Sequence, residues 1–189
     1  EFWHNGLKQL SATKPLLNPS DAAGMKFRVM ASDVLVAQFK ALDAVPQKMA
    51  FSEVYQGLQS GTIQGQENTY SNIYGKKFFE VQDSVTESNH GILDYMVVTS
   101  TEFWDGLPSD IRNQLETILR EVTVSRNAQS FAVNEANKKA ILATGKTIHS
   151  LTDEQRAQWK AAMLPVWDEF TDDVGQHNID AAQAINAQY

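Results

Sequence analysis

Arg28 is the residue whose type and position most suggest a chemical role. It stands in the stretch GMKFRVMASD, within a short apolar run of strand length, and Ser32 after it can cap a helix. A guanidinium offers a planar fork of donors that matches a carboxylate, and a helix N-terminus attracts anions through its free N–H groups. Two interpretations stay open here: Arg28 binds an anionic ligand, or it pairs with a surface acid.

Three further side chains could line a site, and each has an ordinary structural alternative. Phe51 could wall a pocket or belong to the core, and Asn68 in GQENTY could bind a ligand oxygen or form a turn. His90 with Asp94 nearby could be an acid–base pair, or His90 could simply form hydrogen bonds. Because no nucleophile motif, phosphate loop or HExxH pair accompanies His90, we favour a hydrogen-bonding histidine over a catalytic one.

Residues 1–100 alternate short apolar runs with helix-like stretches, which is typical of an α/β fold. We predict a helix that begins at Ser32 and another that begins at Ser52 and ends at Gly61. Residues 62–68 return as strand or loop. The predicted strands are Lys26–Met30, Val45–Met49 and Tyr95–Thr99, the last of them buried.

One long helix is predicted between Pro108 and Gly145, since no Gly or Pro lies between them. At 1.5 Å per residue it would extend roughly 50 Å, so it must bridge two bodies or project. A capping box at Thr152–Gln155 opens another helix, which Pro165 should kink. We expect the tryptophans to belong to the core; those considered are Trp104, Trp159 and Trp167.

Composition restricts the partners. The 189 residues carry a formal charge of -7, which disfavours nucleic acid and anionic lipid. The absence of cysteine excludes disulfides and thiolate metal sites, and no apolar stretch is long enough to insert into a membrane. We expect no cofactor. The chain opens as EFWHNGLKQL without methionine or a signal-peptide-like start, so we expect it to be part of something longer.

Ordered motifs resemble those of a known family. The string GMKFRVMASDVLVAQFKALDAVPQKMAFSEVYQGLQSGTIQGQENTYSNIY is similar to the signature region of the DctP family, the solute receptors of tripartite ATP-independent periplasmic (TRAP) transporters, in its C4-dicarboxylate branch. FWHNGLKQLSATKP, SNHGILDYMVVTS and FWDGLPSDIRNQL continue the likeness to about residue 125.

The resemblance implies a two-lobed α/β periplasmic-binding-protein fold of the type II-like, Venus-flytrap kind. Residues 1–107 would form the second, ligand-binding lobe, 108–145 the helix spanning both lobes, and 146–189 C-terminal helices packing on the lobes. Most of the first lobe would be absent from this chain.

The resemblance also implies site residues. Arg28 would bind a substrate carboxylate, Asn68 would hold the same carboxylate, and Phe51 would pack on the ligand. Ser32 and His90 would line the site or act through water. Lys8 stands where many relatives have an arginine in an NGxR motif, so we expect it to serve the distal carboxylate as a point charge.

The function implied is that of a periplasmic receptor, not an enzyme, which binds malate, succinate or fumarate and delivers it to the small and large membrane subunits of a TRAP permease. Two alternatives stay open: another small organic acid, such as a monocarboxylate or sugar acid, or a sensing partner of a signalling protein. Catalysis by His90 and Asp94 is the least favoured.

Overall fold

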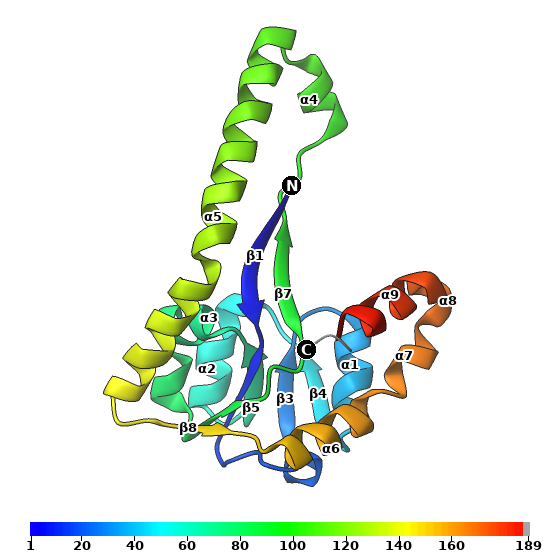
Figure 1. Cartoon of the computed structure of the whole chain (residues 1–189). Coiled ribbons are helices and arrows are strands. Elements are labelled where there is room, and N and C mark those ends of the chain that lie inside the picture. The colour runs from blue at the N-terminus through cyan, green and yellow to red at the C-terminus, as the bar shows by residue number, and fades with distance from the viewer. Residues whose placement is uncertain (187–189) are drawn as a thin grey trace.

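A six-stranded mixed sheet forms the body of the molecule (Figure 1). The computed structural model describes residues 1–186. The strands lie in the order β4-β3-β5-β2-β6-β8. β3 is parallel to β4 and β5, β2 is antiparallel to β5 and β6, and β8 is parallel to β6. Their bounds are Gln9–Ala12 (β2), Lys26–Val29 (β3), Val45–Lys48 (β4), Gly65–Asn68 (β5), Ser84–Glu87 (β6) and Thr147–Ser150 (β8).

Helices cover both faces of this sheet, and each face has its own core. Alternate residues of β3 point to opposite faces, so Phe27 and Val29 share one face while Arg28 points to the other. Phe27 packs with Phe39 of α1 (Asp33–Lys40) and, in the same cluster, Trp159 of α6 (Asp153–Met163). The opposite core lies under α2 (Val54–Gln59), α3 (Tyr70–Gly75) and the end of α5 (Ser109–Ala143). We call the sheet with α1, α2 and α3 the sheet lobe.

A second region projects from the sheet lobe. β1 (Phe2–Leu7) and β7 (Ile92–Met96) form an antiparallel two-stranded ribbon beside α5, and α4 (Thr101–Gly106) lies at its far end (Figure 1). We call β1, β7, α4 and α5 the arm. α5 is one continuous helix of 35 residues, which confirms the predicted long helix. Pro108 is its N-cap, and Gly145 just beyond its end has a φ of +84°, a conformation that favours glycine.

Polar side chains of α5 fasten β1 to the helix. Thr123 accepts a hydrogen bond from the Trp3 indole (2.9 Å), and Asn134 donates to the Asn5 carbonyl (2.6 Å). Asn127 accepts from the His4 backbone N–H (2.9 Å) and donates to the Phe2 carbonyl (3.1 Å). Because β1 is an edge strand, Asn127 and Asn134 satisfy backbone groups that would otherwise lack a partner in the ribbon.

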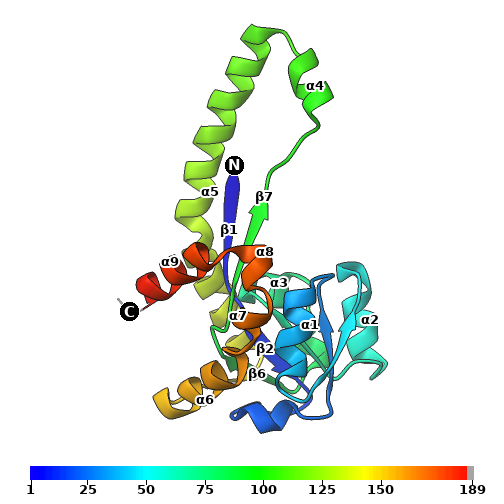
Figure 2. The same ribbon diagram turned by 90° about the vertical axis from the view of Figure 1, so that its right-hand side faces the viewer.

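The C-terminal segment contributes more than helices. β8 joins the sheet next to β6, and α6 follows it with the predicted capping box at Thr152 and Gln155. Three helices follow, α7 (Val166–Glu169), α8 (Thr171–Val174) and α9 (Gln176–Asn186), of which α7 lies beside α1 (Figure 2). Pro165 lies between α6 and α7, where a break was expected. Among residues 1–186, none of the helices combines the length and apolar composition needed to cross a bilayer.

Three local predictions were wrong. The strand predicted as buried at Tyr95–Thr99 is β7, which starts at Ile92 and leaves Tyr95 44% exposed, because within residues 1–186 it pairs only with β1, in a two-stranded ribbon outside the main sheet. Ser52 does not cap α2; it lies in a 3-10 turn, Phe51–Glu53, that precedes the helix. Of the three tryptophans, only Trp159 is buried; Trp104 and Trp167 are half-buried.

Candidate functional site

The predicted site residues converge on one edge of the sheet. β3, β4 and β5 run parallel, so their carboxyl ends meet at this edge, and the antiparallel β2 begins there. The edge therefore collects Arg28 from β3, Phe51 from the turn after β4, Asn68 from the end of β5 and Lys8 before β2. The chain passes from β3 to β4 on one side and returns to β5 on the other, which is the topological switch point where open α/β sheets bind ligands.

Arg28 is buried, with an exposed fraction of 3%. Its Nε donates to the Met49 carbonyl (3.0 Å), which fixes the direction of the guanidinium. No carboxylate within residues 1–186 lies within 4.0 Å of it, so the alternative of a surface ion pair is wrong. Burial lowers the pKa of Arg28, and the negative charge of Glu67 opposes that change. A desolvated cation without an adjacent counter-ion is suited to receive an anion.

Phe51 stands between two cations. The Arg28 guanidinium carbon lies 5.7 Å from the centre of its ring, and the Lys76 ammonium lies 5.6 Å from it. The ring is half-buried and packs edge-on against Phe78, with 5.7 Å between ring centres. Phe51 thus belongs to the rim of one core and also forms an apolar wall beside Arg28.

Asn68 is the last residue of β5 and is buried, so it is not a turn former. Its side-chain oxygen accepts two hydrogen bonds, from the Thr69 backbone N–H (3.1 Å) and from the Asn72 amide (2.7 Å). The oxygen is therefore occupied, and the amide nitrogen is the group left to bind a ligand oxygen.

A buried charged cluster lies at the same edge, on the face of the sheet opposite to Arg28. The Lys8 ammonium is 2.6 Å from Glu67 Oε2, and His90 Nε2 is 3.4 Å from the same oxygen. The other ring nitrogen of His90 bonds the Ser88 hydroxyl (2.7 Å). Burial by itself raises the pKa of Glu67, but its interactions with His90 and with the Lys8 ammonium outweigh burial and hold that pKa below its usual value. His90 is thus a hydrogen-bonding residue in this cluster.

Two other expectations have clear outcomes. Asp94 lies on the β1–β7 ribbon and pairs with His4 (3.0 Å), not with His90, which removes the basis of the acid–base alternative. Ser32 caps α1, accepting from the Leu35 backbone N–H at 3.4 Å, as predicted. It is half-buried, and its hydroxyl has no hydrogen bond to another predicted site residue in the part of the chain that the structure describes.

The sequence analysis missed Glu67 and Asn72. A glutamate inside the strand GQEN, all four of whose residues are buried, is the signal that could have indicated Glu67, because a buried carboxylate requires a charged partner. Asn72 gives no such signal. It lies one helical turn after Asn68, and an asparagine at the start of a helix is common for local reasons.

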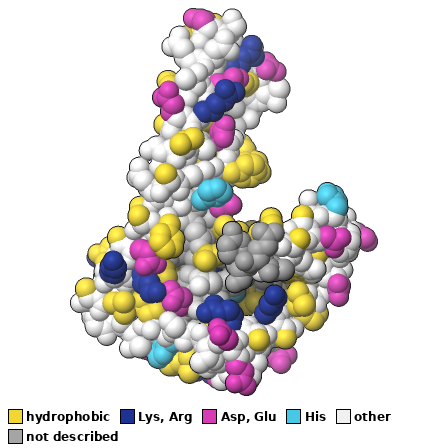
Figure 3. Space-filling model, in the orientation of Figure 1, with side chains coloured by type: hydrophobic (Ala, Val, Ile, Leu, Met, Phe, Trp, Pro, Cys, Tyr) yellow, Lys and Arg dark blue, Asp and Glu magenta, His cyan; other side chains and the backbone are white. Residues whose placement is uncertain are grey.

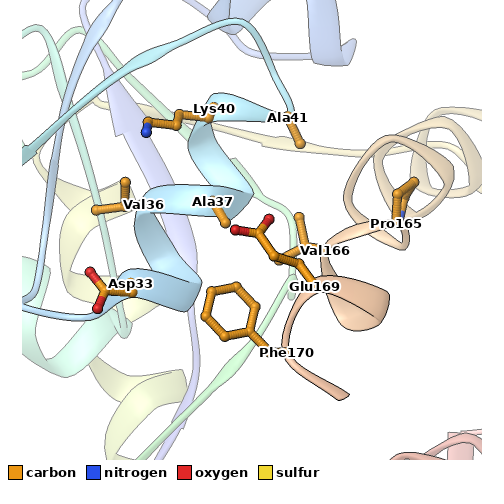
Figure 4. A pocket seen from close by; sticks show the side chains of 9 residues that line it. All are labelled: Asp33, Val36, Ala37, Lys40, Ala41, Pro165, Val166, Glu169 and Phe170. Atoms are coloured by element: carbon orange, nitrogen blue, oxygen red, sulfur yellow. The ribbon is translucent and has the colours of Figure 1, made fainter. Parts of the chain in front are cut away.

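A cavity of about 570 Å³ lies away from this edge, between α1 and α7 (Figure 4). Val166 and Phe170 give it apolar walls, while Asp33 and Glu169 bring two carboxylates to it and Lys40 one ammonium. This charge balance is unsuited to a dicarboxylate. In the space-filling view the surface is notched between the arm and the C-terminal helices, and apolar side chains are scattered along the arm (Figure 3).

Comparisons with known proteins agree with this geometry. The family model described as bacterial extracellular solute-binding protein, family 7 (DctP), matches residues 1–173. The C4-dicarboxylate-binding periplasmic protein DctP of Vibrio cholerae is 61% identical over 98% of this chain and 56% of its own length.

Solved structures give the same result. A TRAP periplasmic solute-binding protein of Shewanella oneidensis with bound succinate matches with a TM-score of 0.96 and 50% identity, over 98% of this chain and 61% of that one. A second, of Pseudomonas aeruginosa with bound L-malate, has a TM-score of 0.87 and 43% identity, over 89% and 59%. The chain thus spans somewhat more than half the length of these relatives.

Proposed function

The chain belongs to the DctP family of bacterial extracellular solute-binding proteins, and from this premise we propose that it binds a C4-dicarboxylate of the malate, succinate or fumarate type. The observation that carries the proposal is Arg28, a buried guanidinium held by Met49 with no acidic side chain adjacent to it. A ligand carboxylate would supply the missing counter-charge. The succinate and L-malate bound by the two similar solved structures support the choice of a diacid.

Each predicted residue has a role in this proposal. Arg28 forms a bidentate pair with one carboxylate, the amide nitrogen of Asn68 donates to the same group, and Phe51 packs on the carbon chain. Lys8 has three N–H donors, of which Glu67 accepts one, so the others can serve the second carboxylate. Ser32 and His90 act at the margin of the site. The remaining part of a chain as long as its relatives would close over this edge.

We further propose that the protein works in the periplasm as the receptor of a TRAP permease, delivering its ligand to the small and large membrane subunits. Support comes from the periplasmic relatives and from the family. The prediction is that cells lacking the full-length gene product lose high-affinity uptake of succinate while keeping the permease, and that adding the purified receptor restores uptake.

The decisive experiment is titration calorimetry on the full-length gene product with succinate, malate, fumarate and a four-carbon monoacid. Arg28→Ala should weaken succinate binding by about 100-fold or more, roughly 3 kcal/mol, because the ligand carboxylate would be buried without its charge partner. Arg28→Lys should recover part of the loss, since lysine keeps the charge without the planar fork.

Arg120→Ala is the matched control, because this arginine is exposed on the arm and should not affect binding. Tight binding of the monoacid together with no binding of any diacid would refute the dicarboxylate proposal. Near-normal succinate binding by a folded Arg28→Ala variant would refute the role of Arg28.

A further inference from the structure

We propose that Asn72 is a positioning residue for the ligand: it fixes the amide of Asn68 in the orientation that presents its nitrogen to the carboxylate, and it anchors that amide to the arm through Tyr95. The inference rests on the proposed function, and it deepens that function by assigning a residue that touches no ligand. It is carried by a set of hydrogen bonds that joins the carboxyl end of β5 to β7 and β1.

The orientation of Asn68 follows from hydrogen-bond chemistry. A backbone N–H can only donate, so the side-chain atom of Asn68 that lies 3.1 Å from the Thr69 nitrogen must be the oxygen. That oxygen also lies 2.7 Å from the side-chain amide of Asn72, whose contacting atom must then be nitrogen. Both acceptor positions of the Asn68 oxygen are therefore filled, one by the backbone and one by Asn72.

Asn72 uses its second hydrogen to reach the arm. Its amide nitrogen lies 3.1 Å from the hydroxyl of Tyr95 on β7, and the same hydroxyl accepts from the Asn5 amide at 2.9 Å. The side-chain oxygen of Asn5 in turn accepts from the Ser71 hydroxyl at 2.7 Å. Since Ser71 precedes Asn72 on α3, these bonds form a closed ring through α3, β7 and β1.

The ring makes one orientation of Asn68 strongly preferred. If the amide turned over, the nitrogen of Asn68 would face two donors, and its oxygen would face the ligand carboxylate. Both contacts are repulsive. A site whose donor is fixed before the ligand arrives loses less ordering entropy on binding, so the ring should raise affinity without contributing a ligand contact.

The test compares variants of Asn72 in two backgrounds of the full-length gene product. Asn72→Asp is nearly isosteric but cannot donate to Asn68 when ionised, so the Asn68 amide should turn over. We expect this change to weaken succinate binding by about 30-fold or more in the wild-type background. In an Asn68→Ala background, only the effect of the added charge remains, and the loss should be at least about tenfold smaller.

A change of specificity separates positioning from damage to the fold. With its oxygen turned outward, Asn68 can accept a hydrogen bond from an amide. The ratio of the affinity for succinamic acid, the monoamide of succinate, to the affinity for succinate should therefore be higher in Asn72→Asp than in the wild type. This shift should be larger when Asn68 is present than in the Asn68→Ala background. Asn113→Asp adds the same charge on an exposed part of α5 and should change neither ratio.

Tyr95→Phe is a milder second variant. It keeps the aromatic side chain and removes only the hydroxyl that accepts the hydrogen bond from Asn72. We expect a loss of about two- to fivefold in succinate affinity, whereas Tyr74→Phe on α3, whose hydroxyl has no hydrogen bond within residues 1–186, should be neutral.

Equal losses for Asn72→Asp with and without Asn68, or no specificity shift, would overturn the inference while leaving the proposed function intact. Failure of the wild-type protein to bind any dicarboxylate would refute the proposed function itself, which the Asn72 variants alone could not do.

Discussion

The carboxyl edge of the sheet and the arm differ in what their side chains contact. At the edge, charged residues are buried: Lys8, Glu67 and His90 contact one another, and Arg28 is held by the Met49 carbonyl. Along the arm, large apolar residues face solvent: Val124 is 72% exposed and Phe131 is 76% exposed. Usually the reverse is found, with charges outside and apolar groups inside.

This difference indicates where each region obtains its stability. The sheet lobe has two closed cores, and it supplies the partners of the buried charges on Lys8 and Glu67, whereas the buried Arg28 has no carboxylate within 4.0 Å among residues 1–186. Several large apolar side chains of the arm, such as Val124 and Phe131, are exposed and contact no apolar layer within residues 1–186. Substitutions should therefore be costly at the edge and nearly neutral at the exposed apolar positions of the arm.

Removing the central carboxylate is the strongest test of this comparison. Glu67→Gln leaves the Lys8 ammonium buried without its counter-charge, so we expect the free energy of unfolding to fall by about 3 to 5 kcal/mol. Chemical denaturation at neutral pH measures this change. Glu116→Gln, a carboxylate on α5 whose side chain is 42% exposed, is the matched control and should be nearly neutral. An unchanged unfolding midpoint in Glu67→Gln would show that the cluster does not support the fold.

Comparing the wild type with Glu67→Gln also predicts how stability depends on pH. Burial alone raises the pKa of Glu67, but His90 and Lys8 lower it overall. A carboxyl with a lowered folded pKa contributes stability above its unfolded pKa, about 4.5, and loses it as the pH falls through the folded value. Wild-type stability should therefore decline below about pH 4.5 more steeply than that of Glu67→Gln.

A substitution at Lys8 tests whether the cluster of Lys8, Glu67 and His90 also binds the ligand. Lys8→Met removes the ammonium and keeps most of the side-chain volume, so it should weaken succinate more than butyrate, by a ratio of about tenfold, because only succinate has a second carboxylate to lose contact with. Paired calorimetric titrations give this ratio directly. Equal losses of affinity for succinate and butyrate would show that Lys8 pairs with Glu67 and does not contact the second carboxylate.

The smallest effect is expected on the arm. Phe131→Ala should change the free energy of unfolding of the 189-residue chain by no more than about 0.5 kcal/mol, since this side chain is already in water. It should reduce self-association, measured by sedimentation at increasing concentration. Phe27→Ala is the same change in the core and should cost as much as Glu67→Gln. A large loss for Phe131→Ala would mean that the arm is internally packed.

The sequence predicted those features that depend on local signals. α5 was predicted because proline and glycine mark its two ends, and its observed bounds, Ser109–Ala143, differ by one or two residues. The capping roles of Ser32 and Thr152 were predicted for the same reason. Ser52 failed because the 3-10 turn Phe51–Glu53 precedes α2, and side-chain pattern alone does not distinguish that turn from a first helical turn.

Features that depend on distant pairing were not predictable in this way. The sequence around β7 indicated a buried strand because Tyr95 and the valines after it are apolar, but its exposure depends on its place in a ribbon that has two strands, β1 and β7, in the described part of the chain. Likewise, Arg28, Phe51 and Asn68 were identified one by one from motifs, whereas their common edge follows from the strand order. The partnership of Glu67 with Lys8 joins residues far apart in the sequence, so no local pattern reports it.

Three adjacent elements leave the sheet lobe on the same side, namely β1, β7 and α5 (Figure 1). They are fastened across their width by the β1–β7 ladder and by the hydrogen bonds of Thr123, Asn127 and Asn134 to β1. A body attached by a single segment can rotate about several axes. A connection made of three adjacent elements, β1, β7 and α5, resists twisting and also resists bending within the plane of the three elements. It bends easily only across its thickness. The sheet lobe and the far end of the arm can therefore move relative to each other by essentially one hinge motion, about a single axis that runs across β1, β7 and α5.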